Sequence, residues 1–232
     1  MFIAKYLAHC GVCSRRNAIE LVRTSQVLVN NKVVTDVTYV VKPTDRVKFE
    51  NKIVKLQPFK YILLNKPRDY VTTLSDERGR RTVLDLIKEK KLGRIYPVGR
   101  LDRMTTGLLV LTNDGEFAQR ISHPKYNITK GYHVVLDKPF EYADLMKLSK
   151  GVRLFDGFAK PDSISYSNKI SKRKVTIKIH SGKKRIIRRL FERLGYEVEK
   201  LDRFMYAGLI KKDLPIGVWR YLRQIEIDKL LG

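Results

Sequence analysis

The segment from Gly99 to Ile121 constrains the fold of this chain more than any other. Leu108 to Leu111 is apolar enough to form a buried strand, and the Asn-Asp-Gly turn behind it provides a cap for a helix over Glu116 to Ile121. Ahead of the strand, two glycines bracket a loop whose backbone can bend tightly and approach a ligand. Asp102 lies in this loop between two arginines. The sequence therefore predicts a carboxylate held on rigid supports at the mouth of a buried strand.

The charge balance indicates a polyanionic partner. The 232 residues include 48 Lys and Arg against 24 Asp and Glu, so the formal net charge is +24. A surplus of this size attracts nucleic acid, and the stretch from Lys169 to Arg193 holds 11 of the cations against the single acid Glu192. No apolar run approaches the roughly 20 residues of a membrane-spanning helix. The amino terminus lacks the pattern of a signal peptide, so we expect a cytoplasmic protein without a membrane partner.

The two cysteines, Cys10 and Cys13, have the spacing of a zinc half-site or of a redox motif. No second cysteine pair accompanies them, and the four histidines are scattered without ligand spacing. We therefore expect small buried side chains at these positions, no disulfide framework, no metal and no cofactor.

The chain divides into two predicted domains, residues 1–57 and 58–232. In the first, an N-cap at Ser14 and apolar residues at helical spacing predict a helix, and Asn-rich turns predict short strand pairs. The second mixes strand and helix periods irregularly, which favours an α+β fold with a mixed, mainly antiparallel sheet and flanking helices over a repeating βαβ array. The clearest predicted strands are 61–64, 108–111, 132–136 and 175–179, and the clearest helices are 116–121 and 185–194.

The first domain has the pattern of an RNA-binding module. Two cations at the start of its helix, Arg15 and Arg16 after Ser14, are placed to hold phosphate, although a solvated helix start is the plainer interpretation. Gly11, Ser14-Arg15-Arg16 and Val27-Leu28-Val29-Asn30 resemble the motifs of the S-four-like RNA-binding domain, named after a ribosomal protein.

Asp102 needs a counter-charge if it is to react. A lone aspartate in a loop is more often a turn former or a salt-bridge partner, but its glycine-bracketed setting favours chemistry. Farther along, an apolar stripe at helical spacing predicts a helix with Arg188 at its edge, where the guanidinium can point into a cleft and keep a carboxylate such as Asp102 ionised. The plainer interpretation, a basic helix bound only to phosphates, describes its other cations: Lys183, Lys184 and Arg189.

Short motifs follow one another in a recognisable order. They are Leu64-Asn65-Lys66-Pro67, Gly79-Arg80-Arg81-Thr82-Val83, Gly99-Arg100-Leu101-Asp102, Thr106-Gly107-Leu108-Leu109, Thr112-Asn113-Asp114-Gly115, Lys130-Gly131-Tyr132, 182–190 and Gly217-Val218-Trp219-Arg220. In order and spacing they resemble the ribosomal-RNA pseudouridine synthases of the RsuA/RluB type over nearly the whole chain. The basic motif departs from the family pattern at four positions, which concern substrate preference rather than activity: Ser181, Lys184, Ile186 and Leu190.

The resemblance implies roles for individual residues. Asp102 matches the catalytic aspartate of the family, and Tyr132 matches the tyrosine that stacks on the target base and can take part in proton removal. Arg188 matches the arginine that pairs with the aspartate, and Arg100 matches the one that helps hold the flipped-out nucleotide. We expect further RNA contacts from eight polar or charged residues: Lys130, Arg185, Arg189, Lys183, Lys184, Ser14, Arg15 and Arg16.

The implied activity is an isomerase that converts uridine to pseudouridine in ribosomal RNA. The reaction breaks the N-glycosidic bond, turns the uracil and joins C5 to the same sugar carbon, so no atom enters or leaves overall. The carboxylate can attack the ribose or remove a sugar proton, and both routes stay open. The Lys-Pro and Gly-Arg-x-Thr-Val segments resemble the large-subunit branch more than the small-subunit branch. We expect a monomer whose partner is ribosomal RNA or a ribosomal subunit precursor.

Two other classes of function stay open at this point. A non-catalytic RNA-binding or ribosome-assembly factor could share the fold and the basic surface, but the joint presence of Asp102, Tyr132 and Arg188 argues against it. A hydrolase that cleaves the glycosidic bond needs a second carboxylate as general acid, and none is placed near Asp102 in the sequence.

Overall fold

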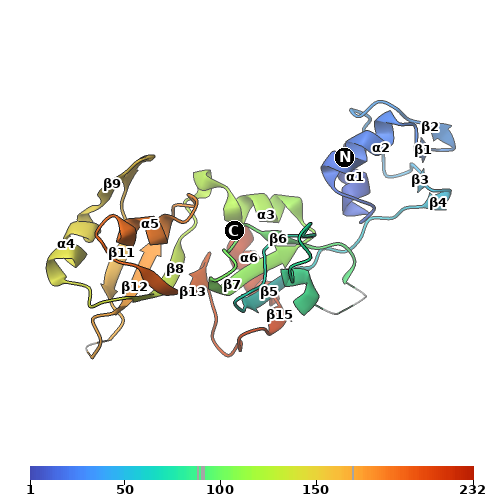
Figure 1. The fold of residues 1–232 in the computed structure, drawn as a ribbon. Helices are drawn as coiled ribbons and strands as arrows, with labels where there is room; N and C mark the ends of the chain where they lie inside the picture. The colour runs from blue at the N-terminus through green and yellow to red at the C-terminus, as the bar shows by residue number, and fades with distance from the viewer. Residues whose placement is uncertain (88, 90–91, 169) are drawn as a thin grey trace. The chain divides into compact units, whose positions relative to one another are not determined.

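The computed structural model describes residues 1–87, 89, 92–168 and 170–232, in two compact units (Figure 1). The first unit consists of Met1–Lys60 and Glu89–Ile95, and the second of Tyr61–Lys88 and Tyr96–Gly232. The second unit begins at Tyr61, close to the predicted boundary between residues 57 and 58. The chain then returns to the first unit for Glu89–Ile95, and no sequence pattern predicted this return. Lys169, at the start of the predicted basic stretch, lies outside the described residues.

The first unit consists of two helices and a small antiparallel sheet with the strand order β2-β1-β3-β4. Its elements are α1 (Ile3–His9), α2 (Arg15–Arg23), β1 (Val27–Val29), β2 (Lys32–Val33), β3 (Val47–Phe49) and β4 (Lys52–Ile53). The predicted N-cap is confirmed, because the Ser14 side chain accepts a hydrogen bond from the backbone N–H of Asn17 at 3.1 Å. Apolar side chains of both helices and of β1 and β3 form one buried core.

The second unit is built on a mixed nine-stranded sheet with the order β11-β12-β8-β13-β7-β5-β15, in which β14 also pairs with β13 and β6 with β7. All of these pairs are antiparallel except β13 with β7, so the predicted mainly antiparallel sheet is confirmed. The strands are β5 (Tyr61–Lys66), β6 (Tyr96–Val98), β7 (Thr106–Thr112), β8 (Lys130–Leu136), β11 (Ser163–Tyr166), β12 (Lys174–Ile179), β13 (Val198–Tyr206), β14 (Leu209–Ile210) and β15 (Trp219–Tyr221).

Helices cover this sheet in two groups, each with its own core. α4 (Tyr142–Lys150) and α5 (Ile186–Glu192) pack with β8 and β12, whereas α3 (Gly115–Ser122) and α6 (Gln224–Leu231) pack with β5 and β7 (Figure 1). The described residues also form the 3-10 turns η1 (Val83–Leu86) and η3 (Pro124–Tyr126) and a separate hairpin of β9 (Val152–Leu154) and β10 (Gly157–Ala159). β13 supplies residues to both cores, so the two halves of the unit meet along this strand.

The strand, turn and helix around β7 follow the predicted pattern. Leu108 to Leu111 is fully buried, and the Asp114 side chain caps α3 by accepting hydrogen bonds from the backbone N–H groups of its first turn. Just ahead, Gly107 has a φ of +108°, and a Cβ at this position would overlap the backbone of Arg203. Only glycine therefore lets β7 run directly beside β13, which fixes the preceding loop against the centre of the sheet.

Candidate active site

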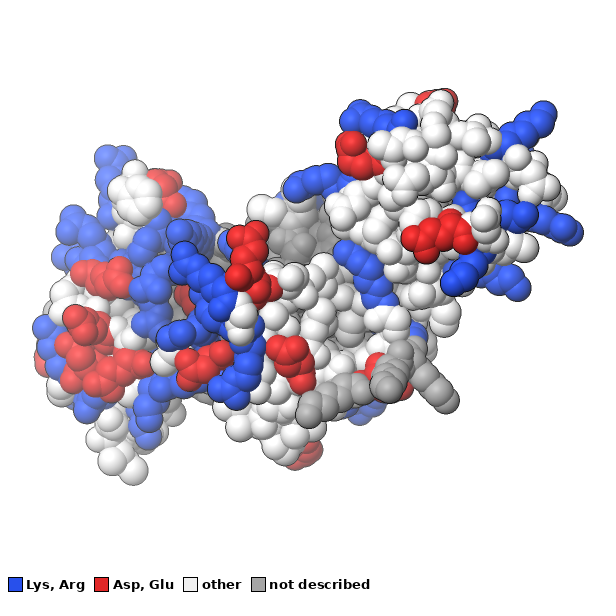
Figure 2. Space-filling view, turned by 45° about the vertical axis from the view of Figure 1, so that its right-hand side comes forward, with Lys and Arg blue, Asp and Glu red and all other residues white. Residues whose placement is uncertain are grey.

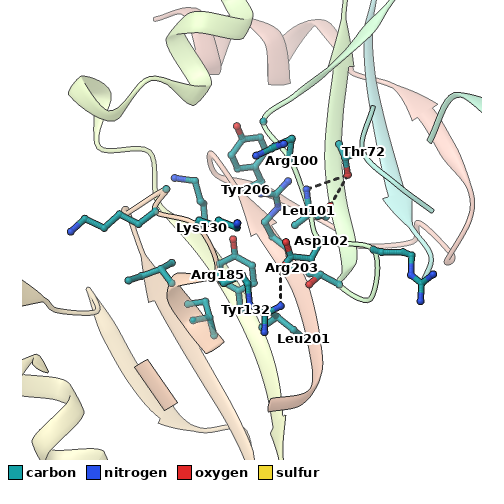
Figure 3. Close-up of a pocket in the computed structure, with 18 of the residues that line it drawn as sticks. Thr72, Arg100, Leu101, Asp102, Lys130, Tyr132, Arg185, Leu201, Arg203 and Tyr206 are labelled. Atoms are coloured by element: carbon teal, nitrogen blue, oxygen red, sulfur yellow. Dashed lines mark hydrogen bonds and ion pairs between the residues drawn. The ribbon is translucent and has the colours of Figure 1, made fainter. Parts of the chain in front are cut away.

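A cavity of about 790 Å³ opens where the two halves of the second unit meet (Figure 3). Its walls come from the loop before β7, from β8 and β13, from the segment after β12 and from residues 71–80. The volume is within the range of ligand-binding pockets. Its described lining holds eight cations and two carboxylates: Arg80, Arg100, Arg103, Lys130, Lys183, Lys184, Arg185 and Arg203 against Asp76 and Asp102.

The two carboxylates have different surroundings. Asp76 is bound tightly by Arg80, whose Nη2 donates to it at 2.6 Å, and this interaction lowers the pKa of Asp76 to about 2. A carboxyl group with such a pKa stays ionised at neutral pH and cannot act as a general acid. Asp102 is half-exposed in the cavity, and its contact with Arg185 is longer, 3.9 Å from Oδ2 to Nη1. Asp102 is therefore the candidate for the reacting carboxylate, and Asp76 does not supply the protonated second acid that a glycoside hydrolase uses.

Two buried side chains hold the loop that carries Asp102. Lys66, at the end of β5, has no exposed surface, and its ammonium donates to the backbone oxygens of Pro67, Arg103 and Thr105 at 2.9, 3.1 and 2.9 Å. The Thr72 hydroxyl donates to the oxygen of Leu101 at 2.8 Å and accepts from its N–H at 3.2 Å. The backbone on both sides of the carboxylate is thereby fixed before a ligand arrives, as preorganised catalysis requires.

Burial lowers the pKa of Lys66 to about 8, and the negative charges of Asp102 and Asp69 oppose that shift. This coupling means that the positive charge of Lys66 also acts on the carboxylate of Asp102.

The strand register brings an aromatic ring and a guanidinium together in the cavity. Tyr132 on β8 pairs directly with Arg203 on β13, and both side chains line the space next to Asp102 (Figure 3). Tyr132 is 8% exposed, so its ring is fixed by packing while one part faces the cavity. This is the position from which a tyrosine can cover the face of a flat ligand held near Asp102.

Arg203 is a charged group at the base of the cavity with unused hydrogen-bonding capacity. It is 3% exposed, its Nε donates to the oxygen of Leu108 at 2.7 Å, and its guanidinium lies 4.3 Å from the centre of the Tyr206 ring. Its Nη2 has no hydrogen-bond partner among the described residues. Lys130 is close enough that the charge of Arg203 adds to burial in lowering the pKa of Lys130 to about 8. Arg203 and Lys130 therefore give this part of the cavity a positive charge that favours a negatively charged ligand.

The structure changes the predicted partner of Asp102. Arg188 was predicted to point into the cleft, but its Nη1 donates to the backbone oxygen of Val198 at 2.5 Å, and Arg188 is not among the residues that line the cavity. Arg185 lies in the lining instead, because it takes a left-handed backbone conformation with φ of 52° directly before α5. Arg188 stays within the field of Asp102, which raises its pKa, whereas burial and the neighbouring Arg185 lower it by more.

The other predicted RNA-binding residues fall into three groups. Arg100, Lys130, Lys183 and Lys184 line the cavity. Arg189 does not reach it, because its guanidinium binds Asp156 at 3.0 Å. Arg15 and Arg16 are exposed on α2 in the first unit, where the Ser14 hydroxyl is occupied as the helix cap.

Four residues of the site were missed by the sequence analysis: Lys66, Thr72, Arg203 and Tyr206. A signal existed for Lys66, a cation that follows the apolar run from Tyr61 to Leu64, because a charge on a buried strand implies a specific partner. Arg203 did not stand out, because Lys200 and Asp202 lie in the same strand. Thr72 and Tyr206 carry no such mark in the sequence.

Metal ligation finds no support among the described residues, where no three His, Cys, Asp or Glu side chains gather closely enough. Burial raises the pKa of the Cys10 thiol to about 11 and also raises that of Cys13, so neither is prepared to bind metal as a thiolate.

None of the described helices has the length and apolar character needed to cross a bilayer.

The fold and the site together place a half-exposed carboxylate in a cavity lined mostly by cations, an arrangement suited to an enzyme that acts on a polyanion. Comparison with known proteins agrees. The RNA pseudouridylate synthase family matches residues 60–193, and the S4 domain matches residues 3–47. The chain is 41% identical to the ribosomal large subunit pseudouridine synthase B of Bacillus subtilis over 98% of its length and 94% of that protein.

Two further comparisons cover the whole length. An RNA pseudouridine synthase of Aquifex aeolicus is 40% identical over 98% of this chain and 92% of its own. A crystal structure of a pseudouridylate synthase superposes with a TM-score of 0.71 at 28% identity and covers 99% of both chains. The chain belongs to the RNA pseudouridine synthase family, with an amino-terminal S4 domain.

Proposed function

We propose that this enzyme converts uridine to pseudouridine in large-subunit ribosomal RNA, with Asp102 as the reacting carboxylate. The observation that carries the proposal is the position of Asp102 as the loosely paired acid in a cationic cavity. The choice of RNA is supported by two relatives named ribosomal large subunit pseudouridine synthase B, from Bacillus subtilis and, at 34% identity, from Buchnera aphidicola. We extend the proposal to a monomer that works in the cytoplasm, on free RNA or on a subunit precursor.

Catalysis begins when the target uridine leaves its stack and enters the cavity. Unstacking costs a few kcal/mol, which the face of Tyr132 offsets by stacking on the uracil. Arg100 and Lys184 at the rim bind the backbone phosphates on either side of the nucleotide. Asp102 then faces the sugar, and the guanidinium of Arg185, 3.9 Å away, orients its carboxylate.

The reaction keeps its atoms in balance whichever way Asp102 acts. The N1–C1′ bond breaks with its electron pair on the uracil, which turns and forms the C5–C1′ bond. C5 loses its hydrogen as a proton, and N1 gains one. During the rotation the uracil carries negative charge, and the cations at the cavity floor, Arg203 and Lys130, stabilise it.

Loss of the C5 hydrogen provides a direct assay. Ribosomal RNA transcribed with 5-tritiated uridine releases tritium to water when pseudouridine forms, and sequencing of the modified base locates the target. Asp102→Asn should lower this release by at least roughly a thousandfold while RNA affinity stays within about twofold. Asp69→Asn, which removes a nearby exposed charge, is the matched control. Turnover retained in Asp102→Asn would remove this residue from the mechanism.

A further inference from the structure

We propose that the tip of the β9–β10 hairpin is a stacking platform for an unpaired RNA base next to the target uridine, with Phe155 as the ring on which that base stacks. The inference rests on the proposed function, because it takes an RNA in the cavity as given. It assigns a second binding element, outside the cavity, to a segment that belongs to none of the sequence motifs.

Phe155 is exposed to a degree that its neighbours do not share. It forms a two-residue turn with Asp156, because Leu154 pairs with Gly157 at the end of the hairpin, and 90% of its surface is accessible. Phe158, on β10, packs against the backbone instead. Its ring lies so close to Gly151 that a Cβ at that glycine would overlap it. Single exposed apolar side chains are common on protein surfaces, so the exposure of Phe155 matters here because charged neighbours hold its ring in place.

The ring of Phe155 is held by a network of charges on one side. The Arg189 guanidinium lies 4.8 Å from the ring centre and donates to the carboxylate of Asp156 at 3.0 Å. That hydrogen bond holds the pKa of Asp156 below its ordinary value, so the pair stays charged at neutral pH. Lys183 donates to the backbone oxygen of Asp156 at 2.7 Å, and Arg193 donates to that of Arg153 at 3.3 Å. The turn is therefore fixed, with one ring face on a cation.

The same network connects the platform to the active site. Lys183 lines the cavity and donates to the backbone of the turn, so the turn lies within the reach of one lysine side chain from the cavity. The same cavity lining contains Arg185, the partner of Asp102. Figure 2 shows many Lys and Arg side chains, with Asp and Glu interspersed, over the half of the second unit that holds α4, α5, β11 and β12. An RNA strand that delivers its uridine to Asp102 passes this side of the cavity with its neighbouring nucleotides.

The chemistry of the platform favours a nucleobase over an apolar partner. Phe155 and the 63%-exposed Phe158 are two rings among cations, less apolar area than a protein or lipid surface needs, whereas one base matches the ring of Phe155 in size. Bases next to a flipped nucleotide have lost a stacking neighbour, and an aromatic face replaces it without regard to base identity. The guanidinium beneath the ring adds to the attraction by polarising it.

The experiment measures RNA affinity and turnover of full-length Phe155→Ala, Phe155→Leu and Phe155→Tyr in the tritium-release assay. We expect Phe155→Ala and Phe155→Leu to raise KM and the RNA dissociation constant by roughly tenfold, with kcat at saturation unchanged, and Phe155→Tyr to match the wild type. Ile225→Ala, which shortens an apolar side chain that is 70% exposed on α6, is the control and should have no effect. Thermal melts establish that each variant is folded, as expected for an exposed turn.

A second readout identifies the occupant. RNA fragments that carry 2-aminopurine next to the target uridine should lose fluorescence on binding the wild type and regain most of it with Phe155→Leu. If Phe155→Leu binds and quenches like the wild type, the platform proposal is wrong, because the apolar volume without the aromatic face then suffices. If the wild type itself releases no tritium from any ribosomal RNA, the proposed function is wrong. If the wild type is active and the Phe155 variants are equally active, only the platform proposal is wrong.

Discussion

The guanidinium of Arg185 lies 3.9 Å from the carboxylate of Asp102, and both side chains are about half-exposed in the cavity. An ion pair so open to solvent contributes at most about 1 kcal/mol to folding, so stability does not explain it. We expect its effect on the reaction instead, because the positive charge attracts and orients the carboxylate of Asp102 while the cavity is still hydrated. Once a nucleotide displaces the water, the same pair becomes stronger.

Replacing Arg185 by Met should therefore affect catalysis and leave stability nearly unchanged. We expect kcat to fall roughly a hundredfold, since the variant loses charge stabilisation in the transition state, while Tm shifts little. Steady-state kinetics and thermal unfolding of the same preparation provide the check. An unchanged kcat would show that the pair has no catalytic role.

Arg188→Met is expected to behave differently. Its loss leaves the backbone oxygen of Val198 without its donor, which costs about 1 to 3 kcal/mol of unfolding free energy. The positive field on Asp102 also weakens, so activity should fall together with stability. A variant that loses activity with an unaltered urea midpoint would instead place Arg188 in direct contact with the substrate.

Tyr132 lets stacking be separated from proton chemistry. If the ring face holds the uracil, Tyr132→Phe should keep activity within about tenfold, whereas Tyr132→Ala should lose a hundredfold or more through both kcat and KM. Single-turnover tritium release measures the two variants under the same conditions. Equal losses in both would point to the hydroxyl group rather than the ring.

Much of this architecture could be predicted from local sequence. β7 and α3 were expected because Leu108 to Leu111 and the Asp114 cap are set by neighbouring residues. The return of Glu89–Ile95 to the first unit was not, because it depends on contacts with residues distant in the chain. Gly93 illustrates this, since a Cβ there would meet the side chain of Gln57.

In the site, too, the residues marked by local motifs were predicted and those placed by distant contacts were not. Asp102 and Tyr132 stand out by motif, and the structure brings both to one cavity. The Arg185 contact was not predicted, because it arises from a left-handed backbone at a non-glycine residue that no local pattern indicates. Arg203 escaped notice because its neighbours come from β7, about 95 residues earlier in the chain, according to its hydrogen bond with Leu108.

Lys66 predicts a specific pH dependence of stability. Burial holds its pKa at about 8 in the folded protein, against 10.5 for an ordinary lysine. Between these values the unfolded chain binds more protons than the folded one, so the free energy of unfolding rises with pH. From pH 7 to pH 10 the wild type should gain roughly 2 kcal/mol relative to Lys66→Met, as measured by urea unfolding at each pH. A difference that stays constant over this range would mean that Lys66 is not desolvated.

The first unit should bind RNA chiefly through phosphates, and the dependence of affinity on salt tests this in the full-length protein. Arg15 and Arg16 are exposed at the start of α2, and each phosphate contact contributes about 0.7 to 0.9 to the slope of log Kd against log salt. Arg15→Gln with Arg16→Gln should therefore lower the slope by about 1.4 to 1.8 and weaken binding, with kcat at saturating RNA unchanged. Lys212→Gln with Lys229→Gln removes the same charge from exposed positions of the second unit and is the matched control. If both double variants lower the slope equally, net charge alone is responsible, and the helix start has no particular role in holding the RNA.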